Sequence, residues 1–205
     1  QYSHSKSQIR CTYIRESYMT LWFTSDTHWG HTNILKFCNR PFEHTHAHDE
    51  ALIENWNNKV KQSDQVYHLG DVALCAPRKL VDILNRLNGR ISFISGNHDK
   101  TALRPQCRER FEEILEYKEI TIQDQELDNK KQIIILFHYP LLTWNKKNWG
   151  SWHLHGHCHH TLPIDRKSAR LDVGVDGHNF SPISYQDIKT IFSIRKLEYA
   201  EENNH

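Results

Sequence analysis

Five short, mostly apolar segments of the chain each run directly into residue types that bind metal ions. The segments are residues 21–25, 65–69, 91–95, 133–137 and 152–155. They are followed by Asp26-Thr27-His28, Gly70-Asp71, Gly96-Asn97-His98-Asp99, His138 and Gly156-His157-Cys158-His159. In α/β sheets, functional groups gather outside the carboxyl ends of the strands. The pattern therefore predicts five strands whose ends converge on one site.

The remaining segments predict an α/β fold. Helices are expected at 44–62, 77–87 and around 109–115, and a capping box from Ser184 to Asp187 opens a last helix. Further strands are expected at 116–122 and 170–175. Alternating strands and helices in the first half favour parallel pairing, whereas the strand-rich second half favours antiparallel or mixed pairing. A four-layer αββα sandwich of two mixed β-sheets flanked by helices satisfies both halves.

The length of 205 residues suits one domain with a substantial core. Residues 1–18 are polar and precede Met19, the only methionine, so we expect them to be a disordered or artificial extension of a protein that starts at Met19. Residues 19–197 are expected to form the single domain. Residues 198–205 are expected to form a polar tail.

Composition narrows the location and the partners. The five cysteines are scattered without CxxC spacing, and the sequence has neither an apolar leader nor an apolar run of roughly 20 residues. These features predict reduced thiols, a cytoplasmic location and no membrane partner. The net charge of +1 gives no general attraction to nucleic acid, which is kept only as a candidate substrate.

The residue types at the five strand ends also constrain the metal. Asp, His and Asn offer oxygen and nitrogen atoms and no thiolate, which favours Mn, Fe, Zn, Ni or Co over a structural zinc cluster. In the pairs Asp26-x-His28 and His157-x-His159, both members face the same side of an extended chain. The glycine that precedes each of Asp71, Asn97 and His157 lets the backbone turn sharply and approach the site closely.

In this order, D-x-H, GD, GNHD, a strand-terminal His and GHxH resemble the calcineurin-like metallophosphoesterase superfamily. The resemblance runs from about residue 21 to about residue 175. Residues 26–31, 39–42 and 137–140 are similar to the small single-domain bacterial and phage members. The family's αββα fold agrees with the fold expected from the segments.

The resemblance implies a role for each matching residue. One metal would be held by Asp26, His28 and His159, and the second by Asn97, His138 and His157. Asp71 would bridge both through its two carboxylate oxygens. His98 would be the general acid, oriented by Asp99. The cofactors implied are two divalent ions, with Mn favoured over Fe, Ni, Zn and Co.

The mechanism implied is phosphoester hydrolysis. A hydroxide that bridges the two metals would attack phosphorus in line with the leaving oxygen, which His98 would protonate. The chain shows no large cap domain, so an open site for a small phosphoester or nucleotide is expected, and a phosphodiester is slightly favoured over a phosphomonoester. The alternative is a catalytically weak scaffold of the same fold that binds proteins; it requires lost ligands, and none is lost.

Several other polar residues are open to more than one interpretation. Arg40 could grip a phosphate bidentately or form an ion pair, and His31 could contact the substrate or begin the next helix. The interpretation favoured for His44, His46 and His48 is a solvated helix entry, and for His68, His153 and His155 it is packing. His160 and His178 lie near the site by sequence. The segment from Trp144 to Trp152 could stack bases between its lysines or be a loop pinned by tryptophans.

Overall fold

The computed structural model describes residues 19–165 and 168–202, so the extension expected at residues 1–18 lies outside the described residues. Within the described chain, nine strands form two sheets. The first sheet has the order β4 (Phe111–Leu115), β3 (Arg90–Ile94), β2 (Gln65–His68), β1 (Leu21–Thr24) and β9 (Ile183–Ser184). The second has the order β5 (Tyr117–Gln123), β6 (Lys131–Phe137), β7 (Trp152–His155) and β8 (Arg170–Asp172).

Helices flank these sheets, and the pairing within each sheet is mixed. The helices are α1 (Ile34–Phe37), α2 (Thr45–Lys59), α3 (Pro77–Leu84), α4 (Pro105–Arg108) and α5 (Tyr185–Glu202), with single turns η1 (Lys147–Trp149) and η2 (Val175–Gly177). Strands β1 to β4 pair in parallel and β9 is antiparallel to β1. Strand β5 is antiparallel to β6, and β6, β7 and β8 are parallel. The expected α/β fold with two mixed sheets is confirmed.

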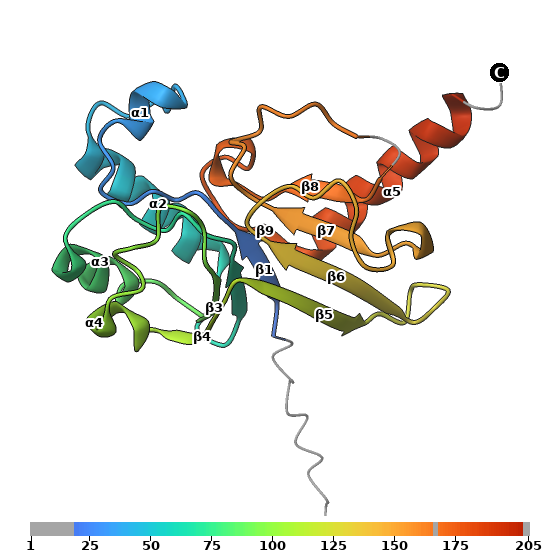
Figure 1. Ribbon diagram of the computed structural model, residues 1–205, viewed down its shortest axis with the longest axis horizontal. Coiled ribbons are helices and arrows are strands. Elements are labelled where there is room, and N and C mark those ends of the chain that lie inside the picture. The colour runs from blue at the N-terminus through green and yellow to red at the C-terminus, as the bar shows by residue number, and fades with distance from the viewer. Residues whose placement is uncertain (1–18, 166–167, 203–205) are drawn as a thin grey trace, which may run out of the picture.

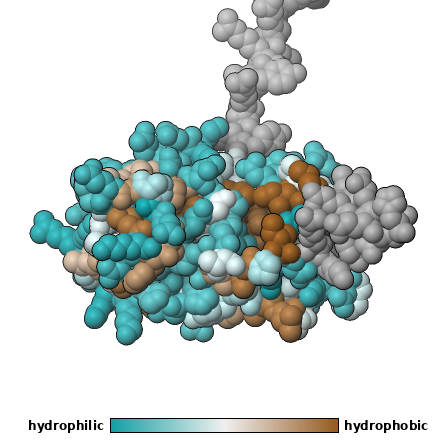
Figure 2. Space-filling model, turned by 90° about the horizontal axis from the view of Figure 1, so that it is seen from above, coloured by the Kyte–Doolittle hydropathy of each residue, from teal (hydrophilic) through white to brown (hydrophobic). Residues whose placement is uncertain are grey.

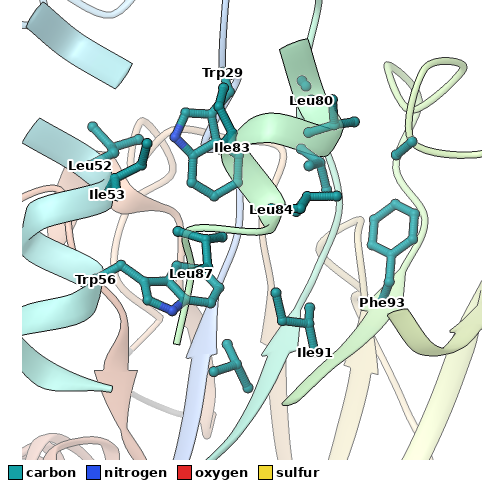
Figure 3. Close-up of a cluster of buried hydrophobic side chains, with 14 of the residues drawn as sticks. Trp29, Leu52, Ile53, Trp56, Leu80, Ile83, Leu84, Leu87, Ile91 and Phe93 are labelled. Carbon is teal, nitrogen blue, oxygen red and sulfur yellow. The ribbon is translucent and has the colours of Figure 1, made fainter. Parts of the chain in front are cut away.

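One hydrophobic core lies between the first sheet and helices α2 and α3 (Figure 3). Helix α2 contributes Leu52 and Trp56, which lie four residues apart and share one face. Helix α3 contributes Leu80 and Leu84 in the same way. Burial of each side chain of this size stabilises the fold by roughly 1.5–3 kcal/mol.

A second core lies between the two sheets. Phe23 and Leu69 from the first sheet pack with Leu154 from the second, and Phe192 of α5 joins them. Successive side chains of a strand point to opposite faces, and so Trp22 packs against the first core while Phe23 enters the second. Buried on both faces, the first sheet fixes the position of its strand ends.

The helix expected around residues 109–115 is wrong. Residues 105–108 form the short helix α4, and the chain then enters strand β4, which pairs in parallel with β3. The ring of Phe111 stacks on that of Phe93, with centroids 4.8 Å apart. A place beside β3 at the sheet edge therefore overrides the helical preference of this glutamate-rich segment.

The last helix begins as expected. The Ser184 hydroxyl donates to Asp187 Oδ2 at 2.7 Å and accepts the Asp187 N–H at 3.1 Å, so the capping box is confirmed. None of the helices among the described residues is long and apolar enough to span a membrane. Figure 2 shows the molecule from above relative to the view of Figure 1. This face is mainly hydrophilic, and its hydrophobic residues lie in separate patches.

Candidate metal centre

The site lies where strands of both sheets end. In Figure 1 the arrowheads of β1, β6 and β7 converge near the middle of the molecule. Past the end of β1, the Asp26 N–H donates to the Gly70 carbonyl at 2.9 Å. In the second sheet, the Gly156 N–H donates to the His138 carbonyl at 2.9 Å. The two sheets meet in a parallel bridge between Ser25 and Gly174, and so the strand ends from distant parts of the sequence reach one place.

The first candidate set consists of Asp26, His28 and His159, whose ligand atoms lie within 4.8 Å of one another. The carboxylate of Asp26 accepts the His157 N–H at 3.1 and 3.0 Å and also the Ser25 hydroxyl. His28 Nε2 is buried without a hydrogen-bond partner. A buried ring nitrogen without a partner is unfavourable, and a cation held by this set would supply the missing interaction.

A carboxylate orients His159. The Nδ1 atom of His159 lies 2.8 Å from Asp176 Oδ2, and carboxylates orient metal-binding imidazoles in this way. Burial alone would lower the pKa of His159, but hydrogen bonds to Asp176 and Cys38 and the charge of Asp26 raise it to about 10. Asp176 had not been expected at the site; the available sequence signal was its place just beyond the strand at 170–175.

The second candidate set consists of Asp71, His138 and His157, again within 4.8 Å, and Asn97 lies among them. Asn97 Oδ1 is 3.1 Å from His138 Nε2 and 3.1 Å from His157 Nδ1. His138 Nδ1 lies 2.7 Å from the carbonyl of Leu69, which accepts its proton and leaves Nε2 free to face the site. All four side chains expected for the second metal, including the bridging one, are together.

Asp71 lies between the two sets. Its Oδ2 atom is 3.6 Å from His28 Nε2 of the first set and 3.6 Å from His138 Nε2 of the second. Its Oδ1 atom accepts the His98 N–H at 2.9 Å. One carboxylate oxygen therefore faces both sets, and the expectation that each set would receive its own oxygen is corrected.

Burial controls the charge of the first set. It raises the pKa of the Asp26 carboxyl to about 8, against the opposing effect of His159. It also lowers the pKa of His28 to about 2, helped by the neighbouring charges of His159 and Arg40. Without cations, Asp26 is thus largely protonated at neutral pH and His28 is a neutral imidazole, the form that binds metals.

The backbone is strained at five of the seven expected ligands. These residues have φ between +47° and +70°, the left-handed region that side chains other than glycine rarely adopt. They are Asp26, His28, Asp71, His157 and His159. Strain of this kind clusters at functional sites, where the surrounding structure enforces it.

Two glycines permit the close approach of the strand ends. A Cβ at Gly156 would lie 2.0 Å from Ser25 Oγ and 2.5 Å from Asp26 Oδ2. Gly70 has φ of +95°, and a Cβ there would lie 2.5 Å from His138 Nδ1. The expectation that glycine before Asp71 and His157 serves a close approach is confirmed.

Asp99 does not contact the ring of His98 through any hydrogen bond among the described residues. Its carboxylate accepts the backbone N–H groups of Asp71 at 2.8 Å, Val72 at 2.8 Å and Gly96 at 2.6 Å. Asp99 therefore holds together the two loops that carry Asp71 and Asn97. The implied role of orienting His98 is replaced by this one.

Arg40 is buried, and the expectation that it grips a phosphate is corrected. Its Nε and Nη2 atoms donate to both oxygens of Asp176 at 2.8 Å, and its Nη groups donate to the carbonyls of Asp26 at 2.7 Å and Thr27 at 3.0 Å. The fifth N–H faces His48 Nε2 at 2.9 Å. A guanidinium has five N–H groups, so none is left for a substrate. Arg40 instead fixes the loop after β1 and Asp176, which orients His159.

Replacement of Arg40 by methionine is expected to lower the free energy of unfolding by about 3–5 kcal/mol, because Asp176 stays buried without its partner. Urea denaturation of the cation-free protein measures the change. Arg86 provides the matched control: it also contacts a carboxylate bidentately, that of Glu50, but both side chains are more than 40% exposed. The Arg86→Met variant should lose only about 0–1 kcal/mol. Equal losses in the two variants would contradict the assignment of Arg40.

An open cavity of about 670 Å³ gives access to the site. Seven of the expected site residues line it: His28, His31, Asp71, Asn97, His98, His157 and His159. His31 Nδ1 lies 3.4 Å from His28 Nδ1, so His31 stands beside the first set and remains a candidate for substrate contact. The side chains of Phe37 and Leu74 are 72% and 46% exposed at the apolar part of the wall.

Several polar residues lie outside the candidate site. His44 Nδ1 accepts the Ala47 N–H at 3.0 Å as a helix cap, which agrees with a helix entry, whereas His48 is fully buried against Arg40 and is not solvated as expected. His68 is a buried core residue, as interpreted. His153 is fully buried, which agrees with packing, and its Nε2 atom accepts the Leu141 N–H at 3.0 Å.

The segment from Trp144 to Trp152 is a loop pinned by tryptophans. The Trp144 and Trp152 side chains are buried, and Trp144 Nε1 donates to the Ser151 carbonyl at 3.2 Å. The loop returns to the start of β7, so Trp149 and Lys131 line a separate cavity of about 650 Å³ at the opposite end of the sheet. That cavity contains none of the candidate ligands.

Comparison with known proteins identifies relatives along most of the chain. The model of the calcineurin-like phosphoesterase superfamily domain matches residues 19–182. An uncharacterized protein of Methanocaldococcus jannaschii is 36% identical over 172 residues, covering 80% of this chain and 86% of the relative. The Gene 66 protein of Mycobacterium phage L5 is 26% identical over 180 residues, covering 76% and 86%. The crystal structure of a protein of unknown function from Aquifex aeolicus is similar, with a TM-score of 0.62 and 25% identity over 84% of this chain and 99% of that one.

Proposed function

Because the chain belongs to the calcineurin-like phosphoesterase superfamily, we propose that it is a hydrolase that uses two divalent cations to cleave phosphodiesters in preference to phosphomonoesters. The position of Asp71 carries the proposal. Its Oδ2 atom is equidistant from His28 Nε2 and His138 Nε2, with three more donors converging on each side. Two donor sets that share one carboxylate oxygen would suit a pair of divalent cations held close together.

The donor atoms fit such cations. The first set leaves His28 Nε2 buried and unpartnered, and in both sets an imidazole is oriented through its other nitrogen, by Asp176 or by the Leu69 carbonyl. Oxygen and nitrogen donors suit Mn, Fe, Ni, Zn and Co, among which we favour Mn. When bound, the two cations would supply a water of lowered pKa and neutralise the charge of the phosphoryl group.

The chain's own residues would handle the proton and the substrate. His98 is exposed at the cavity, its backbone is fixed by Asp71 Oδ1, and its ring centroid is 5.9 Å from that of His28. It carries no role in either donor set, so its imidazole is free to protonate the leaving oxygen. His31 lines the same cavity and would contact a non-bridging phosphate oxygen.

The shape of the cavity supports the proposed preference for diesters. It is open, and its wall includes the exposed apolar side chains of Phe37 and Leu74, against which a second organic substituent could rest. The test compares turnover of bis(p-nitrophenyl) phosphate and p-nitrophenyl phosphate with Mn²⁺, Fe²⁺, Ni²⁺ or Zn²⁺ supplied in turn. Faster turnover of the diester supports the proposal, faster turnover of the monoester refutes the preference, and no turnover of either refutes the function.

Cation binding is expected to strengthen as the pH rises. In the cation-free protein burial holds the pKa of Asp26 at about 8, and that of His159 is about 10, so both groups carry protons at neutral pH. A cation must displace these protons, which makes the affinity increase by about tenfold per pH unit for each proton released. Calorimetric titration with Mn²⁺ between about pH 6 and pH 8.5 measures the slope. Asp26→Asn, which has no carboxyl proton to lose, should give a shallower slope; an affinity that falls with pH would contradict the expectation.

A further inference from the structure

A thiol lies beside the first candidate set. Cys38, His159 and Asp176 offer a sulfur, a nitrogen and an oxygen atom that all lie within 4.8 Å of one another. Cys38 follows helix α1, where its N–H donates to the Ile34 carbonyl at 3.0 Å, and its side chain lines the cavity. The group is distinct in composition from both sets described above, because it contains a thiol.

The three donors are held in place without a cation. Arg40 contacts both oxygens of Asp176, and Asp176 Oδ2 lies 2.8 Å from His159 Nδ1. Cys38 is partly exposed, and so an ion can reach its sulfur from the cavity. Three protein donors and an open fourth position are the usual arrangement of an accessible zinc site.

The sulfur changes which ions the group prefers. A thiolate is a soft donor that selects zinc and its heavier relative cadmium, whereas the oxygen and nitrogen donors around Asp71 also suit manganese. We propose that Cys38, His159 and Asp176 form an inhibitory binding site for a thiophilic divalent cation such as Zn²⁺ or Cd²⁺. On binding, the Cys38 thiol and the His159–Asp176 pair each release a proton to solvent.

Competition for His159 makes this site inhibitory. A neutral imidazole has one unprotonated nitrogen, so it cannot give a lone pair to two cations unless it loses its last proton. A cation bound through His159 Nδ1 therefore leaves the Asp26–His28 set with one donor fewer. The thiophilic ion and the ion of the first set exclude one another, although both lie at the same cavity.

The test uses Cd²⁺ added to the protein preloaded with Mn²⁺ under reducing conditions. The readout is the ultraviolet charge-transfer absorption of a cadmium–thiolate bond, which does not depend on catalysis. Wild type is expected to develop this band, and Cys38→Ser to lack it. Cys158 is the matched control, because it is also a partly exposed thiol that lines this cavity but does not belong to the donor group. Cys158→Ser should keep the band.

Hydrolysis gives a second readout, which alone rests on the proposed function. Half-inhibition of Cys38→Ser should require at least about tenfold more Cd²⁺ than that of wild type, since loss of even an outer partner weakens metal sites by 10–100-fold. A thermal melt equal to that of wild type shows that Cys38→Ser is folded, and Cys38→Ala serves if it is not. No band in wild type, a band that persists in Cys38→Ser, or equal loss in Cys158→Ser would overturn the proposal. Absence of all hydrolysis would overturn only the proposed function, because the band still decides this one.

Discussion

The Asp71→Asn variant is expected to lose both cations, with an affinity for each that falls by more than about 100-fold. Loss of a partner that merely orients a ligand already weakens metal sites by 10–100-fold, and Asp71 Oδ2 faces both donor sets directly. Asparagine removes the charge yet tolerates the positive φ of 56° at this position, so the backbone is preserved. Elemental analysis after gel filtration measures the bound metal, and turnover should disappear with it.

Asp82→Asn is the control for this variant. Asp82 is exposed on α3, so its replacement removes the same charge at a position away from the site. It should retain both cations. Two ions per chain in Asp71→Asn would refute the bridging role. Loss of one ion alone would show that Asp71 serves a single set.

The His98→Ala variant is expected to keep both cations and to lose about 10²–10⁴-fold in turnover, the usual contribution of a positioned general acid. Its side chain belongs to neither donor set, so metal content and stability should be unchanged. The loss should be greatest for a diester with a poor leaving group such as an alkoxide. It should be smallest for a nitrophenolate, which departs without needing a proton.

His46→Ala is the control for this variant. The His46 imidazole is 79% exposed on α2, so its replacement removes a histidine outside the candidate site. Its turnover of both diesters should equal that of the wild type. The role of His98 would be disproved by equal losses on good and poor leaving groups, or by turnover of the alkyl diester at the wild-type rate.

The strand ends could be predicted from the sequence because their signals are local. Each buried strand is a short apolar run, and the turn that follows must carry its ligands within two or three residues. Hence β7 was predicted with its observed bounds. Asn97 and His138, which were predicted to share a site, lie 3.1 Å apart between Oδ1 and Nε2. The segment that became β4 could not be predicted in this way, since its strand state depends on pairing with β3.

The residues that support the ligands could not be predicted, because their partners are distant in sequence. Arg40 and Asp176 are 136 positions apart, and nothing local distinguishes that pair from a surface ion pair. Asp99 follows His98 in the motif, yet its oxygens turn to the backbone of Asp71 and Val72. His48 was grouped with His44 and His46 as a solvated helix entry, and only the folded loop brings Arg40 to it.

The left-handed backbone at five ligand positions bears on how a chain like this could change over generations. A residue other than glycine held in that conformation costs about 1–3 kcal/mol, against a total native stability of about 5–15 kcal/mol. A lineage that kept the fold only as a surface for binding proteins would gain stability by drifting to glycine or asparagine at these positions. The ligand set would then be the first part to decay. This chain has aspartate or histidine at all five positions, as the proposed metal binding requires.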